Sequence, residues 1–353
     1  MTTHEPEITA AVDLCGPDGR LNPAAAGWSR TPLHRANLRG WGRTKRWEYW
    51  CVTSPTHLVS VTVSDIDFLS LNTVYVLEYA REGRPAVEFE RTALVPFGRG
   101  VELPEGIAGS GGPHGGDVTV GPEKPIRGQV RVSLAHEPGG TRLRARAVSP
   151  DGLPVELDVL AALPEGHETL SVVVPWSEKR FQFTSKHTAL PASGSLRIGD
   201  RTLPFADDAW ATLDHGRGRW PRAITWNWGA ASGTTDGHTV GLQFGGKWTD
   251  GTGATENALC VDGRLSKIGD QIDWHYDPAD FMRPWTLRTQ NSDQVDLTFT
   301  PFHDRRTRTE AVLLANRTDQ CFGHYSGRIR TDAGDVVHID RLLGWAEEVR
   351  MRW

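Results

Sequence analysis

The segment Ala258-Leu-Cys-Val-Asp-Gly-Arg264 joins a short apolar run to an Asp-Gly pair. Asp-Gly favours the tight turn that connects two antiparallel strands. The segment Ile198-Gly-Asp-Arg201 carries a Gly-Asp pair between similar neighbours. Both segments therefore predict antiparallel β-hairpins.

Short runs that alternate or are rich in β-branched residues recur along the whole chain, with Gly, Pro or Asp between them. The pattern of residues 277–282 and 343–350 also allows a short helix in each. Many short strands at near-regular spacing predict an all-β barrel or sandwich. A break near residues 191–194 predicts an N-terminal arm (1–45), a first barrel half (46–192) and a second half (193–353). The strand predictions cover residues 47–53, 58–63, 74–79, 129–134, 142–148, 170–174, 181–184, 223–228, 239–244, 258–261, 295–300, 325–330 and 336–339.

Composition excludes several classes of function. The chain has 353 residues, a net charge of only −5 and scattered Lys and Arg, which argues against a nucleic-acid partner. The N-terminus lacks a basic region followed by an apolar run, and no segment has the roughly 20 apolar residues that span a bilayer. Four distant cysteines show no zinc-ligand spacing and are expected to be buried free thiols. We therefore expect a cytoplasmic protein with no integral membrane segment, metal or cofactor.

Tryptophan is unusually abundant. The chain has 14 Trp against 5 Tyr and 3 Met, and most lie in residues 28–50 and 210–285. Large aromatic residues fill barrel cores, but they also line ligand cavities, where their faces attract cations.

The densest polar and aromatic segment is Trp210-Ala-Thr-Leu-Asp-His-Gly-Arg-Gly-Arg-Trp220. Asp214 next to His215, among Trp residues, supplies an acid, a base and a low-dielectric surrounding for proton transfer to an apolar small molecule. Strand alternation would place His215 and Arg217 on one face and Asp214 on the other, leaving Arg217 to hold a substrate oxygen. Alternatively, Asp-His-Gly caps a turn and the arginines pair with carboxylates. The substrate-binding candidates of this region are Trp210, Arg217, Trp220, Trp226, Asn227 and Trp228.

A second polar segment runs from Lys247-Trp248 through Asp250 to Glu256-Asn257. Asp250 and Glu256 form a possible carboxylate pair for glycoside cleavage, or hard oxygen ligands for calcium. A plain hairpin connection is the commoner use of such a Gly/Thr-rich segment. We expect Glu256 to join Asp214, His215 and the tryptophans around one pocket, with Asp250 as a further catalytic candidate. Lys247, Trp248 and Asn257 are candidates for substrate binding.

Two further segments are irregular. The Gly-rich residues 98–121 are expected to form a mobile lid or a linker. The basic residues 21–45, interrupted by Gly and Pro, are expected to lie across a surface as an arm.

The sequence resembles the bacterial family that carries the domain of unknown function 2804 over nearly its whole length. The matching segments include Val12-Asp-Leu-Cys-Gly-Pro-Asp-Gly-Arg, Lys45-Arg-Trp-Glu-Tyr-Trp-Cys, Leu213-Asp-His-Gly-Arg-Gly-Arg-Trp-Pro, Trp226-Asn-Trp-Gly, Lys247-Trp-Thr-Asp-Gly-Thr-Gly-Ala-Thr-Glu-Asn and Gly344-Trp-Ala-Glu-Glu. This family name implies no activity.

The order Asp214-His215, Trp226-Asn-Trp228 and Asp236-Gly237 is also similar, more distantly, to carotenoid 1,2-hydratases and AttH-like proteins. That resemblance implies two tandem lipocalin-like antiparallel β-barrel halves with few short helices. It implies Asp214 and His215 as an acid/base pair and the two tryptophans as a cavity wall. Gly216-Arg217-Gly218 departs from that group's pattern, in which an acidic or amide residue and an aromatic residue follow the His.

The leading hypothesis is a cofactor-independent lyase or isomerase. It would hydrate, isomerise or cyclise a terpenoid- or lipid-like molecule in a Trp-lined barrel cavity. The alternatives are a non-catalytic lipid- or isoprenoid-binding protein and a carbohydrate-active hydrolase using Asp250 and Glu256.

Overall fold

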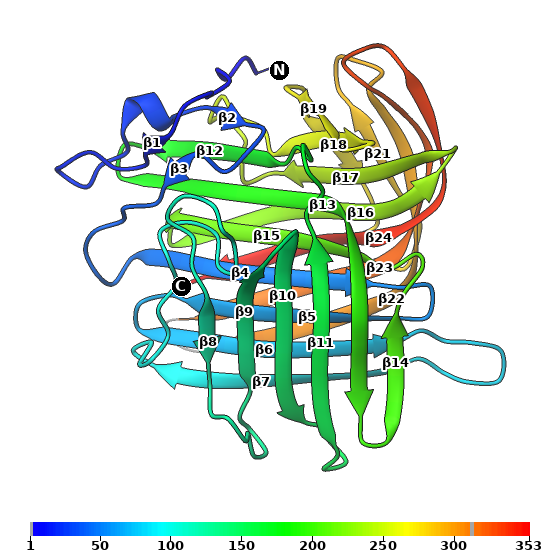
Figure 1. Ribbon diagram of the computed structural model, residues 1–353. Helices are drawn as coiled ribbons and strands as arrows, with labels where there is room; N and C mark the ends of the chain where they lie inside the picture. Colours follow the sequence, from blue (N-terminus) through cyan, green and yellow to red (C-terminus); the bar gives the residue numbers. More distant parts are fainter. Residues whose placement is uncertain (1–2, 311–313) are drawn as a thin grey trace.

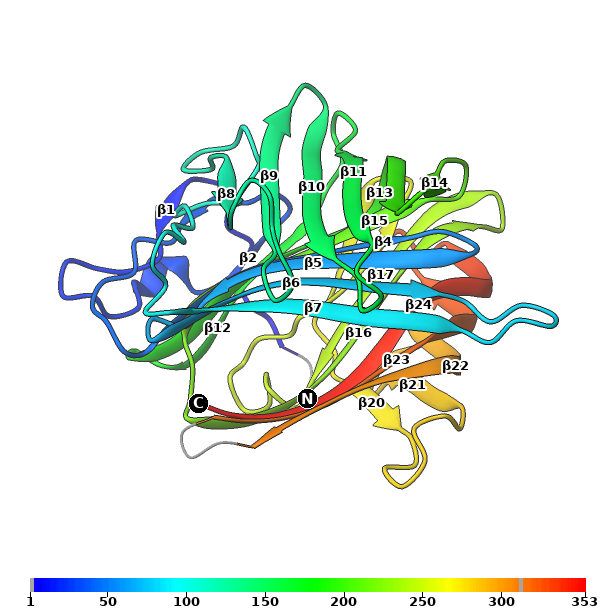
Figure 2. The same ribbon diagram turned by 90° about the horizontal axis from the view of Figure 1, so that it is seen from below.

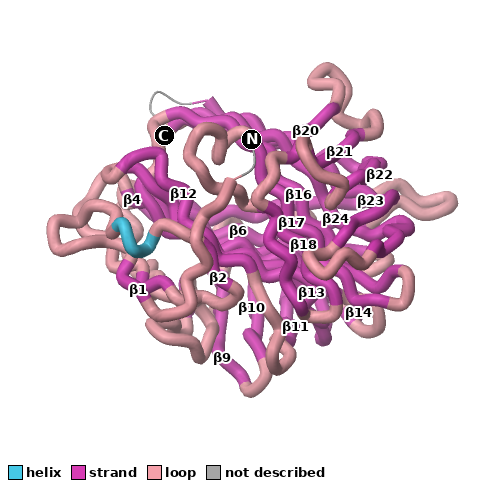
Figure 3. Tube along the Cα trace, turned by 90° about the horizontal axis from the view of Figure 1, so that it is seen from above, coloured by secondary structure: helices cyan, strands magenta, loops and turns pink. Residues whose placement is uncertain are grey.

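The computed structural model describes residues 3–310 and 314–353, and nearly all its elements are β-strands (Figure 1, Figure 3). The described residues include a single helix, the 3-10 turn η1 (Pro23–Ala25). The all-β prediction is therefore confirmed. The two short helices were predicted wrongly: residues 277–282 form turns, and residues 343–350 lie in strand β24 (Val336–Arg352). β24 pairs with a strand on each side, so its backbone polar groups are satisfied as a strand.

The first sheet contains thirteen strands, in the order β7-β6-β5-β4-β15-β13-β11-β10-β9-β8, with β12 and β14 paired to β13 and β2 paired to β12. Neighbouring strands in this sheet pair antiparallel. The strands are β2 (Trp28–Ser29), β4 (Thr44–Thr53), β5 (His57–Asp65), β6 (Leu69–Glu78), β7 (Val87–Pro96), β8 (Val118–Val120), β9 (Arg131–Glu137), β10 (Gly140–Val148), β11 (Pro154–Ala162), β12 (Leu170–Ser177), β13 (Arg180–Ile198), β14 (Arg201–Phe205) and β15 (Trp210–Arg219).

The long strand β13 bends the first sheet. Its register with β15 shifts between His187 and Leu190, and Ala189 in this bulge has a positive φ of 57°. Up to the bulge β13 pairs with β12 and β15; the pairing with β15 ends at Pro191, and from Ala192 on β13 pairs with β11 and β14. Because a bulge sharpens the local bend, β9–β11 run across β4–β7 in Figure 1. The face between them holds the first apolar core, which includes Trp50, Val61, Val132 and Leu157.

The second sheet contains nine strands in the order β19-β18-β17-β16-β24-β23-β22-β21-β20. The predicted Asp-Gly hairpin joins two of them, and Asp262 and Gly263 have φ values of 49° and 78°, as a two-residue hairpin turn requires. The strands other than β24 are β16 (Ala223–Thr235), β17 (His238–Gly246), β18 (Asn257–Val261), β19 (Arg264–Ile268), β20 (Ile272–His275), β21 (Trp285–Thr289), β22 (Val295–Glu310) and β23 (Ala315–Arg330).

Both sheets curl, and together they form the tandem lipocalin-like arrangement that the sequence predicted (Figure 2). The second half has its own apolar core, which includes Phe244, Trp285 and Phe299. The change from one sheet to the other falls between Arg219 and Ala223. Strands β14 and β15 therefore belong to the first sheet, although they follow residue 193.

The N-terminal segment packs along both sheets. It contains the short parallel pair β1 (Val12–Asp13) and β3 (His34–Arg35), and its Trp28 pairs with β12 of the first sheet. Glu5 forms a buried ion pair of 2.7 Å with Lys267 of the second sheet. This segment therefore ties the two sheets together at one edge.

Candidate active site

A cavity of about 600 Å³ lies between the two sheets, rather than inside either apolar core. Its walls come from β4–β7, β13 and β15 of the first sheet and from β16 and β22–β24 of the second. On β4, Lys45, Trp47 and Tyr49 face the cavity, whereas Trp50 and Val52 face the first core. A cavity of this size accommodates a small organic molecule.

Three charged side chains meet in this cavity and form what we call the cavity cluster: Lys186, Asp214 and Glu256. Lys186 and Asp214 are cross-strand neighbours on β13 and β15, and Glu256 enters from the second sheet just before β18. The Lys186 Nζ lies 2.8 Å from Asp214 Oδ1 and 3.3 Å from Glu256 Oε1. It also lies 4.3 Å above the Trp228 ring. Two carboxyl groups therefore share one buried ammonium group.

This charge imbalance sets the protonation of the cavity cluster. Burial raises the pKa of Glu256 to about 7, opposed by the Lys186 ammonium and reinforced by Asp214. Burial lowers the pKa of Lys186, but the two carboxylates outweigh it and the net shift is upward. A charged lysine thus lies beside a carboxyl group that gains and loses a proton near neutral pH.

A second buried carboxyl group, Glu347 of β24, lines the same cavity. Burial raises its pKa to about 7, although the Trp226 indole nitrogen donates a 3.0 Å hydrogen bond to Oε1. Two groups with pKa values of about 7 therefore line the same cavity, an arrangement typical of acid/base sites.

Tryptophan rings build the apolar wall. Trp220 is at its centre, with a ring-centroid distance of 5.7 Å to Trp226, 5.4 Å to Trp248 and 5.7 Å to Trp353. The Trp220 indole nitrogen donates to the Gln182 side chain at 2.6 Å, so the ring orientation is fixed. The wall presents aromatic faces, which attract positive charge.

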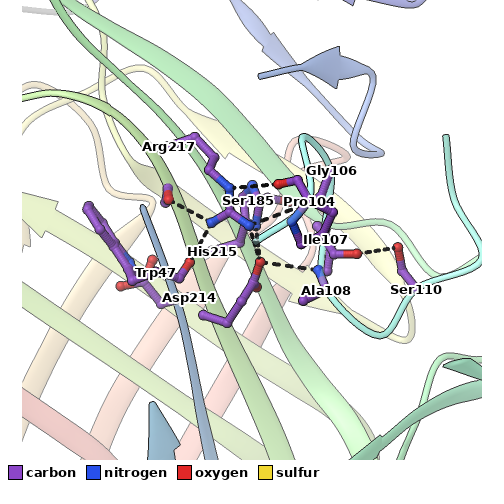
Figure 4. Close-up of polar contacts among 12 residues, drawn as sticks. Trp47, Pro104, Gly106, Ile107, Ala108, Ser110, Ser185, Asp214, His215 and Arg217 are labelled. Atoms are coloured by element: carbon purple, nitrogen blue, oxygen red, sulfur yellow. Dashed lines mark hydrogen bonds and ion pairs between the residues drawn. The ribbon is translucent and has the colours of Figure 1, made fainter. Parts of the chain in front are cut away.

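His215 and Arg217 lie on the opposite face of β15, away from the cavity (Figure 4). They form what we call the clamp cluster with Glu48 of β4. Glu48 Oε1 lies 2.8 Å from His215 Nδ1 and accepts a hydrogen bond of 2.6 Å from Arg217 Nη2. All three side chains are at most 1 % exposed. The structure thus does not place His215 with Asp214 in one pocket, and Arg217 is bound to protein atoms instead of facing a substrate.

The clamp cluster fastens the Gly-rich loop. Arg217 donates to the backbone oxygens of Pro104 and Gly106, and the Ala108 amide donates to Glu48. Residues 104–108 are therefore held against the first sheet, although the sequence predicted a mobile lid or linker for residues 98–121. No local pattern predicts this contact, because Glu48 is 60 positions from Ala108 and Arg217 is 111 positions from Gly106 along the chain.

The structure divides the remaining predicted residues into two groups. Trp220, Trp226, Trp228 and Trp248 line the cavity with Asp214 and Glu256. The second group lies outside the cavity and consists of Trp210, Asn227, Lys247, Asp250 and Asn257.

The residues of the second group have other contacts. Asn227 and Lys247 bind the Tyr276 hydroxyl, and Lys247 also pairs with Glu348 at 2.7 Å. Asn257 joins the Gly245 amide to the Asp270 carbonyl, which is a structural role.

Asp250 is exposed in a turn, so the structure does not bring it together with Glu256 in the cavity. Trp210 begins β15 and lines a separate depression that it shares with Tyr79 and His324.

Sequence reasoning missed Lys186 and Glu347. Lys186 interrupts a strand of buried residues, and a buried lysine normally needs a partner, so its position in β13 was a usable signal. Glu347 lies in the closing Gly-Trp-Ala-Glu-Glu segment, where two adjacent carboxylates must face opposite sides of a strand. Within the described residues, no three His, Cys, Asp or Glu side chains are grouped so that they could bind a metal ion. The same residues contain no helix of the length and apolarity needed to cross a bilayer.

Solved structures with a similar fold have sequences that differ strongly from the sequence of this chain. Kievitone hydratase from Nectria haematococca is 11% identical, with a TM-score of 0.48 over 88% of this chain and 89% of that chain. A provisionally assigned AttH from Nitrosomonas europaea is 13% identical, with a TM-score of 0.47 over 88% and 92%. CghA is 8% identical, with a TM-score of 0.41 over 97% of both chains. No curated protein matches the sequence.

A family model, in contrast, matches the sequence itself over residues 5–353, which include both halves and the cavity. The chain therefore belongs to the family of the domain of unknown function DUF2804.

Proposed function

We propose that this protein is a cofactor-independent acid/base enzyme of the lyase or isomerase type, which acts on a mostly apolar small molecule in the cavity between the sheets. The observation that carries the proposal is Glu256, a fully buried carboxyl group with a pKa of about 7 beside Lys186 and a wall of tryptophan rings. A general acid or base works best when its pKa lies near the working pH.

The cavity cluster supplies each part of a proton-transfer cycle. Protonated Glu256 gives its proton to an unsaturated carbon, and the positive charge that develops is stabilised by aromatic faces of the tryptophan wall. The Lys186 ammonium compensates the carboxylate that is left behind. The resulting cation loses a proton to the Glu256 carboxylate either directly or after it has been attacked by water or by a second double bond, so Glu256 regains its proton in each case. The outcome is isomerisation, hydration or cyclisation, and none of these needs a redox cofactor.

The lining of the cavity favours a terpenoid- or lipid-like substrate that carries a few oxygen atoms. Tryptophan and leucine side chains cover part of the surface, and hydroxyl side chains line the strands beside them. These hydroxyl side chains are Thr62, Ser64, Thr73, Thr92, Thr184, Thr307, Thr309 and Thr318.

The test is turnover in heavy water. Purified protein is incubated with a panel of polyenes and terpenoid alcohols, and deuterium incorporation or addition of water is followed by mass spectrometry. Glu256→Gln keeps the shape of the side chain but removes its acid, so turnover should fall by about 10²–10⁴-fold while ligand affinity is almost unchanged. Asp214→Asn should also lower turnover, because it removes one of the two carboxylates that hold Lys186.

The control is Glu348→Gln, the neighbour of Glu347 on the face of β24 that points away from the cavity, which should retain wild-type turnover. If Glu256→Gln keeps full activity on a substrate that the wild type converts, Glu256 is not the acid. Tight binding without any conversion across the panel would favour the non-catalytic lipid- or isoprenoid-binding protein.

A further inference from the structure

Lys45 is a second buried lysine of the cavity, and the acid/base chemistry above does not use it. It lies on the cavity side of β4 and is 3 % exposed. Its Nζ lies 5.1 Å from the Phe68 ring centroid and 5.2 Å from the Trp353 ring centroid. The described residues give it one hydrogen bond, to the Ile66 carbonyl oxygen at 3.5 Å, and no carboxylate partner.

The two lysines of the cavity therefore differ in their charge balance. Lys186 has two carboxylates within 3.3 Å, whereas Lys45 has only aromatic faces and a carbonyl oxygen. The nearest acidic groups, Asp65 and Asp67, are bound by Arg46 at 3.4 and 3.2 Å. Burial lowers the pKa of Lys45 to about 8, although these two carboxylates act in the opposite direction. The Lys45 ammonium group is therefore mostly protonated at pH 7. A buried charge without a partner is costly, and an anion would remove this cost.

The distance between Lys45 and the cavity cluster defines the length of a ligand that would reach both. Tyr49 is the cross-strand neighbour of Asp214, and Lys45 lies four residues before it on the same face of β4. Four residues of a strand span roughly 13 Å. Between the two ends lies the tryptophan wall around Trp220.

We propose that Lys45 binds the carboxylate of an elongated apolar acid whose other end lies at the cavity cluster. The proposal deepens the proposed function, and it rests on that function only for the identity of the reacting end. A single ammonium group between two aromatic rings suits one negative charge, whereas a phosphate or diphosphate usually takes several cations or a guanidinium fork. The substrate class is thus an elongated terpenoid or lipid acid.

Retinoic acid and retinol are suitable probes, because they share one isoprenoid body and differ in the carboxylate. Quenching of tryptophan fluorescence at pH 7 reports binding of either. The wild-type protein should bind the acid roughly tenfold or more tightly than the alcohol, the size expected of a charge-assisted contact. Lys45→Met should remove this preference by weakening the acid alone, Lys45→Arg should retain it, and the exposed control Lys179→Met should leave both affinities unchanged.

Equal affinity of the wild-type protein for the acid and the alcohol would overturn the proposal without any variant having to fold. Absence of binding of both probes, or an unchanged preference in Lys45→Met, would overturn it as well. The proposed function is judged separately, because Glu256→Gln should lose turnover but keep the preference for the acid.

Discussion

Strand β15 carries Asp214 and His215 side by side, yet the two residues belong to clusters with opposite properties. The cavity cluster has two carboxyl groups and one ammonium group beside a cavity of about 600 Å³. The clamp cluster has one carboxylate, one guanidinium group and an imidazole, sealed beneath residues 104–108. Burial alone therefore does not mark a functional site: the balanced, sealed cluster fixes the structure, and the unbalanced, open one is able to exchange a proton.

The largest effect is expected in the clamp cluster. Arg217→Met leaves Glu48 buried without its guanidinium partner, and breaking a buried ion pair in this way costs about 3–5 kcal/mol. Urea denaturation should show this loss in the free energy of unfolding. The control Arg180→Met, on the neighbouring strand β13, removes an arginine whose side chain, within the described residues, binds a backbone oxygen and no carboxylate, and it should change stability by about 0.5 kcal/mol or less. If Arg217→Met lowers the free energy of unfolding by less than about 1 kcal/mol, the clamp cluster does not stabilise the first sheet and the loop of residues 104–108 bound to it.

A smaller, pH-dependent effect is expected for two adjacent residues of β24. Burial raises the folded-state pKa of Glu347 from 4.5 to about 7. The folded protein therefore binds this proton more tightly than the unfolded chain, and the resulting stabilisation is complete below pH 4.5 and is lost as the pH rises through 7. Glu347→Gln removes this dependence. Its free energy of unfolding, relative to that of the wild type, should therefore rise by on the order of 1–3 kcal/mol between pH 4.5 and pH 8.

Glu348 is the matched control, because it faces the other way. Burial opposes ionisation, but Lys247 and Tyr276 outweigh it and lower the pKa of Glu348. Its stabilisation is present above the unfolded-state pKa and is lost as the pH falls, so Glu348→Gln should lose stability at pH 8 more than in acid. Denaturation curves of Glu347→Gln between pH 4.5 and pH 8, and of Glu348→Gln between pH 3 and pH 6, measure the two slopes. Slopes of the same sign would show that the two faces of β24 do not differ in this way.

The smallest effect is expected at His215. Burial lowers its pKa despite the neighbouring Glu48, so it is neutral at pH 7 and contributes a hydrogen bond within the clamp cluster. His215→Gln should cost about 0.5–1.5 kcal/mol of stability and leave turnover within about twofold of the wild type. A thermal melt measures the effect on stability, and steady-state kinetics measure the effect on turnover. A loss of turnover as large as that of Glu256→Gln would restore His215 as a catalytic residue and end the distinction between the two faces of β15.

The fold was accessible from the sequence because its signals are local. Alternating runs and the Asp262-Gly263 turn predict strands and hairpins, and the clustered tryptophans predict an aromatic wall. Asp214 and Glu256 were expected to lie near each other, and both line the cavity.

The remaining parts of the site depend on pairings between distant segments. Alternation puts Asp214 and His215 on different faces of β15, but only the pairing of β15 with β4 determines which face has Glu48 and which has the cavity. The local sequence does not show which partner Lys186 has. Its role depends on its ion pair with Glu256, which belongs to the other sheet. The position of the cavity between the sheets likewise depends on how the halves pack.

The pairing of β15 with β4 also determines how this chain must fold. Glu48 and His215 are separated by 167 residues, and β15 is the strand that joins β4 to β13 in the first sheet. Until residue 219 has left the ribosome, both of those strands have unpaired edges, which are templates for aggregation. Closing a loop of this length before any contact forms makes folding slow, as in other proteins dominated by non-local strands. High-level expression should therefore benefit from slow synthesis or from chaperones that shield strand edges.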